Sequence, residues 1–165
     1  MQARVLRGLR VMSPHELTLA DTAAQETRSP PLYVRDLMTK DVFTLERNEK
    51  LSVADDVMRL GRVRHLPIVD ADGALAGIVS QRDLFHSGLM KALGYGTHAQ
   101  RQSLDLLVAK EAMRTDVVTT TPDTTLRDAA KVMLDKKIGC LVVLDAAKIV
   151  GILTESDFVK LCAGA

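Results

Sequence analysis

The chain has 165 residues, 47% hydrophobic and 26% charged, a balance typical of a globular protein with one core or two small halves that share one. Its formal net charge of +1 provides no general basic surface for nucleic acid, and aromatic residues make up 3%, too few to stack exposed bases. Since no run of about eighteen apolar residues is present and residues 1–10 lack the apolar core of a signal peptide, we expect no membrane span and a cytoplasmic protein.

The first 33 residues stand outside the patterned part of the chain. Prolines in Ser13-Pro14 and Ser29-Pro30-Pro31 interrupt regular structure there. We interpret residues 1–33 as an N-terminal arm, which is either held loosely or docks on a partner or on a second copy of the chain.

Residues 34–88 form a first unit, called repeat one below. Its predicted elements are a short strand at residues 42–45, a helix at 51–60, strands at 65–69 and 75–79, and a second helix after the last strand. Ser52 and Asp55 give the first helix a start signal, and Gly61 gives it a stop. The turn at residues 70–73 ends in a glycine, which supplies the positive φ of a hairpin.

Residues 109–165 form a second unit, repeat two, and residues 89–108 link the two repeats. Its predicted elements are a strand at residues 117–119, a helix starting at Thr125 and a hairpin of strands at 139–144 and 149–153. The helix is predicted to bury one face, made of Leu126, Ala129, Ala130, Met133 and Leu134. The hairpin turn at residues 145–148 lacks a glycine, so we expect a differently shaped hairpin.

The two repeats match position by position. Equivalent residues lie 75 apart up to the hairpin turn, as Asp41 and Asp116 do, and 74 apart after it, as Asp83 and Asp157 do. The offset changes from 75 to 74 at the hairpin turn, and a turn is where the deletion of one residue is tolerated. A register this long indicates a duplicated structural unit.

Each repeat carries a glycine-led stretch that runs from a strand into a helix. Residues 77–83 read Gly-Ile-Val-Ser-Gln-Arg-Asp, and residues 151–157 read Gly-Ile-Leu-Thr-Glu-Ser-Asp. The hydroxyl residue and the aspartate three positions later have the spacing of a capping box. The same groups can instead present a hydroxyl and a carboxylate to a ligand at a helix start. The sequence leaves both interpretations open.

No catalytic residue and no metal ligand is expected. His15, His65, His86 and His98 share no metal-ligand or nucleophile spacing. Cys140 and Cys162 suggest neither a metal cluster nor a disulfide framework. We therefore expect a protein that is not an enzyme and that uses no cofactor.

The order of elements and three short motifs resemble the cystathionine-β-synthase (CBS) domain. The motifs are Met38-Thr39 and Met113-Arg114, each followed by Asp-Val, the strand at residues 64–70 that reads Arg-His-Leu-Pro-Ile-Val-Asp, and the two glycine-led stretches. The resemblance implies an α+β fold of two CBS repeats, each of the β-α-β-β-α type, packed as a pseudo-two-fold module. It also implies binding of AMP, ADP, ATP or S-adenosylmethionine in clefts between the repeats, and control of an unknown partner protein.

The resemblance assigns roles to residues in both clefts. Asp83 and Asp157 are expected to accept hydrogen bonds from ribose hydroxyls, with Ser80 and Thr154 beside the sugar or phosphate. The family combines the aspartate of one repeat with the adenine slot of the other. One cleft then joins Asp157 and Thr154 to Lys40, Val42, Val63 and His65, and the other joins Asp83 and Ser80 to Thr115, Val117, Ile138 and Cys140.

Phosphate groups require cations or helix N-termini, and the candidates are Arg64, Arg82, Lys110 and Arg114, with His65 beside them. Arg64-His65 corresponds to Gly139-Cys140 in repeat two, so we expect the two clefts to differ in affinity. His65 either makes its cleft sensitive to pH or is a structural histidine.

A second interpretation is a module that dimerises or docks on a protein without any ligand. Leu84, Leu89 and Leu93 are predicted to expose an apolar helical face that needs cover. We therefore expect a homodimer under either interpretation.

Overall fold

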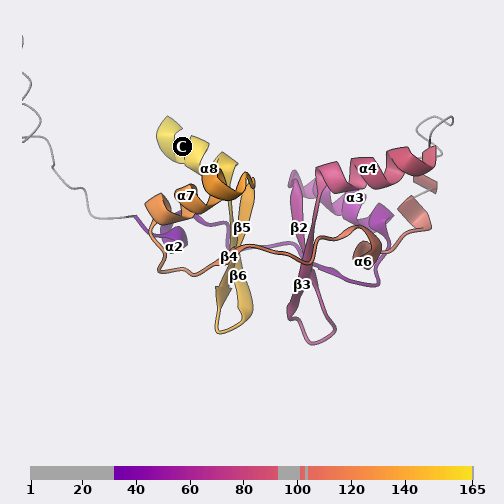
Figure 1. The fold of residues 1–165 in the computed structure, drawn as a ribbon, viewed down its shortest axis with the longest axis horizontal. Coiled ribbons are helices and arrows are strands. Elements are labelled where there is room, and N and C mark those ends of the chain that lie inside the picture. Colours follow the sequence, from indigo (N-terminus) through magenta and orange to yellow (C-terminus); the bar gives the residue numbers. More distant parts are fainter. Residues whose placement is uncertain (1–31, 93–100, 103, 165) are drawn as a thin grey trace, which may run out of the picture. The chain divides into compact units, whose positions relative to one another are not determined.

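The computed structural model describes residues 32–92, 101–102 and 104–164, without the side chains of 87–92 (Figure 1). Repeat one contains α2 (Val34–Leu37), β1 (Leu45–Glu46), α3 (Leu51–Gly61), β2 (His65–Val69), β3 (Leu75–Ser80) and α4 (Gln81–Ala92). Repeat two contains α6 (Ala109–Ala112), β4 (Thr119–Thr120), α7 (Leu126–Lys136), β5 (Cys140–Asp145), β6 (Lys148–Thr154) and α8 (Glu155–Ala163). The predicted α+β class and the duplicated unit are confirmed. The predictions for residues 1–31 lie outside the described residues.

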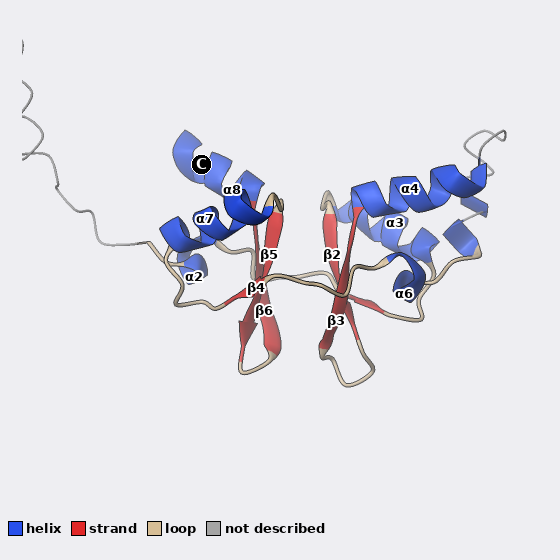
Figure 2. Cartoon of the chain, viewed as in Figure 1, coloured by secondary structure: helices blue, strands red, loops and turns tan. Residues whose placement is uncertain are grey.

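Each repeat builds a three-stranded sheet, in the orders β1-β2-β3 and β4-β5-β6. The first strand of each sheet runs parallel to the second, and the second and third form an antiparallel hairpin. In Figure 2 the two sheets lie next to each other, with α3 and α4 beside one and α7 and α8 beside the other. In both hairpins the first residue of the middle strand is opposite the last residue before a helix, as His65 is opposite Ser80 and Cys140 opposite Thr154.

The first helix of each repeat packs on the core of the other repeat. Val34 in α2 is fully buried among residues of repeat two such as Leu126 and Met133. Its backbone N–H donates to the carbonyl of Thr124 at 2.9 Å. Ala109 in α6 is buried in the core of repeat one, where its N–H donates to the carbonyl of Glu49 at 2.8 Å. Each core is therefore completed by a helix from the other half of the sequence.

The chain crosses between the repeats directly after these helices. Thr39 and Ile152 exchange backbone hydrogen bonds of 2.9 Å in both directions, and Ile78 and Arg114 do the same at 2.9 Å. These two bridges join the segment after each first helix to the third strand of the opposite sheet. They fix residues 39 and 114 beside the strands that lead into α8 and α4.

The first strands begin later than predicted. Strand signals placed them at residues 42–45 and 117–119, whereas β1 and β4 begin at Leu45 and Thr119. The N–H of Val42 donates to the carbonyl of Lys40 at 3.0 Å, and that of Val117 to Thr115 at 3.0 Å. These tight turns hold the two valines off the sheets, where they line cavities instead.

Two predictions of burial were wrong. Leu134 is 76% exposed, because eight residues of helix turn it about 80° from Leu126 at about 100° per residue. Leu84 is 3% exposed and packs in the core of repeat one, so it adds nothing to an apolar outer face. The side chains of Leu89 and Leu93 lie outside the described residues. Within the described ranges, no helix has the length and apolar content that crossing a membrane requires.

The two hairpins differ at their turns, as expected. Gly73 has a φ of 82° in repeat one, whereas Ala146 and Ala147 take φ values of 44° and 67° in repeat two. Two consecutive residues with positive φ are typical of a type I′ turn, which favours asparagine and glycine.

Candidate functional site

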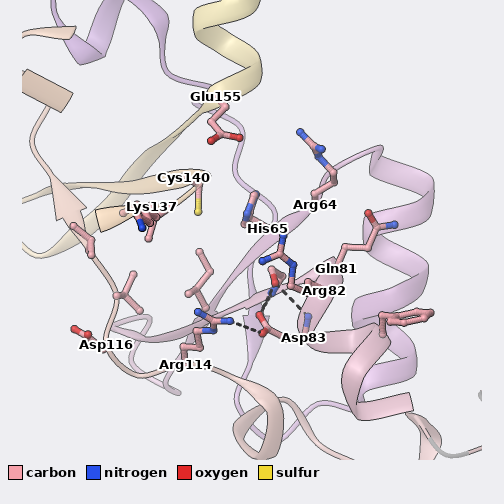
Figure 3. A pocket seen from close by; sticks show the side chains of 17 residues that line it. Arg64, His65, Gln81, Arg82, Asp83, Arg114, Asp116, Lys137, Cys140 and Glu155 are labelled. Carbon is pink, nitrogen blue, oxygen red and sulfur yellow. Dashed lines mark hydrogen bonds and ion pairs between the residues drawn. The ribbon is translucent and has the colours of Figure 1, made fainter. Parts of the chain in front are cut away.

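The aspartate at the start of α4 has its two carboxylate oxygens in different roles. Oδ2 of Asp83 accepts from the backbone N–H of Ser80 at 2.9 Å and from its hydroxyl at 2.5 Å. Oδ1 accepts from Nη2 of Arg114 at 3.2 Å (Figure 3). The capping box therefore occupies one oxygen, and the second oxygen is held by a residue of repeat two.

The aspartate at the start of α8 repeats half of this arrangement. Oδ2 of Asp157 accepts from the backbone N–H of Thr154 at 2.8 Å and from its hydroxyl at 2.7 Å. Oδ1 accepts at 3.3 Å from Lys160, three positions later in the same helix. Asp157 is 4% exposed, so this carboxylate is the more enclosed of the two.

A cavity of about 670 Å³, the large cavity, opens at the start of α4 between the two repeats (Figure 3). Repeat one contributes Ser80 and Asp83 at its wall. Repeat two contributes an apolar side made of Val117, Val118, Ile138 and Cys140. The charged residues around it are Arg64, Arg82, Arg114, Lys137, Asp116 and Glu155.

A cavity of about 140 Å³, the small cavity, lies at the start of α8. Most of its lining residues are the counterparts of the large cavity's lining residues, with the repeats exchanged. Thr154 and Asp157 come from repeat two, and the matching apolar residues Val42, Phe43 and Val63 come from repeat one. Each cavity thus combines the aspartate of one repeat with the apolar residues of the other.

Bulkier side chains stand at two lining positions of the small cavity. Phe43 stands at the position of Val118, and its ring lies against Gly61, where an added β-carbon would be 2.9 Å from Cε2 of the ring. His65 stands at the position of Cys140. A phenylalanine and a histidine therefore line the small cavity at positions where a valine and a cysteine line the large one.

The structure brings most of the proposed site residues to the cavities. Arg64 and His65 line both cavities, and Arg82 and Arg114 line the large one. Three others line neither cavity: Lys40, Thr115 and Lys110. The carbonyls of Lys40 and Thr115 accept in the tight turns described above, and the ammonium of Lys110 bonds to Oδ1 of Asn48 at 3.0 Å.

Several lining residues were missed by the sequence reading. Asp116, Lys137 and Glu155 line the large cavity, and Phe43 and Lys160 line the small one. The repeat register contained a signal for one of them. Lys137 matches Arg62 at a shift of 75, and both cations directly precede the apolar residues Ile138 and Val63.

The electrostatic surroundings lower the pKa of two groups here. Burial lowers the pKa of His65, and the charge of Arg64 adds to this, against the opposing effect of Glu155 and Asp83. Burial pushes the pKa of Asp83 upward, but the hydrogen bonds from Ser80 and the charge of Arg114 outweigh it, so this pKa lies below its usual value.

The thiol in the large cavity is not activated. Burial raises the pKa of Cys140 to about 12, so the thiolate that acts as a nucleophile is absent at neutral pH. In the part of the chain that the structure describes, no three His, Cys, Asp or Glu residues gather closely enough to hold a metal ion. The residues that line the cavities can form hydrogen bonds, apolar contacts and ion pairs with a ligand.

Comparisons with known proteins agree on one family. A family model described as the CBS domain matches residues 34–89 and 109–164. A CBS domain-containing protein of Dictyostelium discoideum is 32% identical over 129 residues, 78% of this chain and 89% of that protein. A homoserine O-acetyltransferase of Methanohalobium evestigatum is 32% identical over 130 residues, which are 78% of this chain but 24% of that enzyme.

Solved structures share the fold. The CBS domain pair of protein MJ0100, in complex with 5′-methylthioadenosine and S-adenosyl-L-methionine, aligns with a TM-score of 0.66 at 28% identity over 82% of this chain and 98% of that one. CBSX2 in complex with AMP aligns with a TM-score of 0.65 at 27% identity over 81% of this chain and 97% of that one. With two matched domains and a shared fold, the chain belongs to the CBS domain family as a tandem CBS pair.

Proposed function

We propose that this CBS pair is a regulatory module that binds an adenosine compound in the large cavity and thereby modulates a partner protein. The main supporting observation is a cavity of about 670 Å³ that is lined by a carboxylate of one repeat and by apolar side chains of the other. This volume falls within the range of roughly 300 to 1,000 Å³ typical of small-molecule sites. AMP, 5′-methylthioadenosine and S-adenosylmethionine bound to relatives support the ligand class.

In this proposal the ribose, the adenine and the phosphate groups of the ligand each contact residues of matching chemistry. Oδ1 of Asp83 accepts from the ribose hydroxyls while Oδ2 stays in the capping box, so capping and binding are compatible. The adenine lies against Val117, Ile138 and Cys140. The cations for phosphate groups are Arg64, Arg82, Arg114 and Lys137.

The small cavity is the weaker site of the pair. Its volume of about 140 Å³ is below the usual range for small-molecule sites. Thr154 and Asp157 would take the roles of Ser80 and Asp83 there, with Val42, Val63 and His65 as the slot. We propose that one adenosine compound binds per chain at low ligand concentration.

A thermal-shift titration with AMP, ADP, ATP and S-adenosylmethionine tests the proposal. Ligand at a hundred times its dissociation constant stabilises a protein by about 2.7 kcal/mol. Asp83→Ala should lose this stabilisation, whereas Asp157→Ala should keep it. Asp128→Ala is the matched control, because Asp128 accepts from the hydroxyl of the N-cap residue Thr125 at the start of α7 and lines neither cavity. If none of the four ligands shifts the transition at millimolar concentration, the proposal fails.

A ligand-free interaction module is the second candidate, and one observation favours it. Phe85 in α4 and Val159 in α8 occupy equivalent positions and are 54% and 67% exposed. Exposed apolar side chains on these helices suit a homodimer, and Val159 lines neither cavity, whereas Phe85 also lines the large one. Light scattering of the purified chain and of Val159→Asp checks this: a dimer that the substitution dissociates supports it, and a monomer at micromolar concentration rejects it.

The rest of the assignment is part of the same proposal. Residues 34–88 and 109–165 are the two repeats, 89–108 the linker and 1–33 an arm. The role is binding and not catalysis. Both cysteines are free thiols, which fits a reducing compartment such as the cytoplasm. A pull-down with and without ATP would identify the regulated partner.

A further inference from the structure

Arg114 is positioned by backbone contacts, and its side chain is largely exposed. Its N–H and carbonyl exchange 2.9 Å hydrogen bonds with Ile78, which fixes its α-carbon beside β3 of the other repeat. Its side chain is 65% exposed, while that of Asp83 is 14% exposed. The guanidinium lies 3.2 Å from Oδ1 of Asp83, and Figure 3 shows it at the wall of the large cavity.

This ion pair conflicts with ribose binding. Since Oδ2 of Asp83 is held in the capping box, Oδ1 is the oxygen left to accept from a sugar diol. In the structure Arg114 holds that oxygen. A sugar that takes Oδ1 replaces a charged donor by neutral ones, which is unfavourable unless the guanidinium gains another anion.

We propose that Arg114 selects phosphorylated adenosine compounds, because a phosphate takes its guanidinium and so releases Asp83 for the ribose. The inference rests on the proposed function and names its ligand class. Uncharged adenosine offers the guanidinium no anion. S-adenosylmethionine carries its sulfonium on the 5′ carbon, where AMP carries the phosphate, and its carboxylate lies several bonds farther from the ribose. Guanidinium binds phosphate with two parallel hydrogen bonds, so the exchange of partners conserves a charge-assisted contact.

The surroundings of Arg114 favour the same ligand class. Arg64, Arg82 and Lys137 line the same cavity, and together with Arg114 they outnumber its carboxylates, which are Asp83, Asp116 and Glu155. Among the residues that the structure describes, the small cavity has no equivalent of the ion pair between Arg114 and Asp83. Thr39 stands at the position of Arg114 in the small cavity, and Asp157 is held by Lys160 of its own helix.

Isothermal titration calorimetry of the full chain with AMP, adenosine and S-adenosylmethionine tests the inference. The wild type should bind AMP at least about tenfold tighter than the other two, the scale of one charge-assisted hydrogen bond. Arg114→Met should weaken AMP about tenfold and bind adenosine more tightly, because Asp83 no longer needs to be released. The ratio of the two dissociation constants is the readout, and it separates selection from a general loss of structure.

Two further variants complete the test. Arg114→Lys keeps the charge but not the paired donors, so its ratio should lie between those of the wild type and Arg114→Met. Arg59→Met removes an arginine that pairs with Asp56 at 3.0 Å outside both cavities, and it should leave the ratio unchanged.

The outcomes separate this inference from the proposed function. An unchanged ratio in Arg114→Met and Arg114→Lys, or wild-type binding of S-adenosylmethionine tighter than AMP, overturns the inference and leaves an adenosine site standing. No binding of any of the three ligands to the wild type overturns the proposed function and the inference with it.

Discussion

The sulfur of Met38 occupies the space that a β-carbon on Gly151 would need. An alanine there would place its β-carbon 2.5 Å from Sδ of Met38 and 3.1 Å from the carbonyl oxygen of Thr39. The same approach exists between Met113 and Gly77, at 2.6 Å. The glycine that leads each repeated stretch therefore leaves room for a methionine side chain where the two halves of the chain cross.

Gly151→Ala should destabilise the fold by about 1 to 3 kcal/mol, the usual cost of overpacking. Urea unfolding followed by circular dichroism measures this. Gly139→Ala is the control, since its nearest neighbours would lie 3.5 Å away, in ordinary contact. Equal losses in the two variants would contradict the explanation.

Val34→Ala should loosen repeat two, although Val34 belongs to repeat one by sequence. The side chain is fully buried in the core that contains Leu126 and Leu141, so its truncation costs about 2 kcal/mol. Hydrogen exchange should become faster in α7, β5 and β6 before it does in β2 and β3. Leu32→Ala, at a residue 47% exposed, should change neither. Faster exchange confined to β2 and β3 would show that α2 packs on its own repeat.

Phe43→Val should enlarge the small cavity, because it restores the residue that stands in the large one. We expect the number of AMP molecules bound per chain to rise from one to two in calorimetric titrations. Val118→Phe is the reverse substitution and should weaken binding at the large cavity. A stoichiometry that stays at one in Phe43→Val would mean that the phenylalanine does not limit the small cavity.

The stability of the protein should fall below about pH 6.5 in a manner that depends on His65. Its pKa is lowered from 6.5, mainly by burial, so the folded protein binds fewer protons at this residue than the unfolded chain does. The contribution to the free energy of unfolding is complete above pH 6.5 and decreases as the pH falls toward the folded pKa.

His65→Asn should remove this dependence. Unfolding free energies of both proteins between pH 5 and 8 supply the measurement, and the difference between them should be constant above about pH 6.5. A His65 ring resonance that titrates above 6.5 in nuclear magnetic resonance spectra would contradict the burial argument.

Local patterns in the sequence were sufficient to locate α3, α4, α7 and α8, the hairpins and the aspartates at the two helix starts, but the short helices α2 and α6 were not predicted. The strand-to-helix stretches are specified by neighbours in sequence, such as Ser80 and Asp83. The turn around Ala146 and Ala147 was expected to differ for lack of glycine, and it does.

The exchange of the first helices was not predictable in the same way. Val34 and Ala109 are apolar residues that fit either of two similar cores, and no local pattern says which one they enter. The ring of Phe43 lies against Gly61, a contact between segments apart in sequence. The pairing of Arg114 with Asp83 needs the same crossing, so it appears only once the two halves are placed together.

Because α2 packs in the core of repeat two and α6 in the core of repeat one, we expect that neither half of this protein has a complete hydrophobic core when it is expressed alone. A fragment that ends after α4 would lack Ala109 in the core of repeat one. It would also expose Val34, because the core in which α2 packs would be missing. Folding then requires contacts between residues far apart in sequence, and such contacts slow folding. Co-expression of the two halves as separate fragments should recover one complex, and either fragment by itself should aggregate.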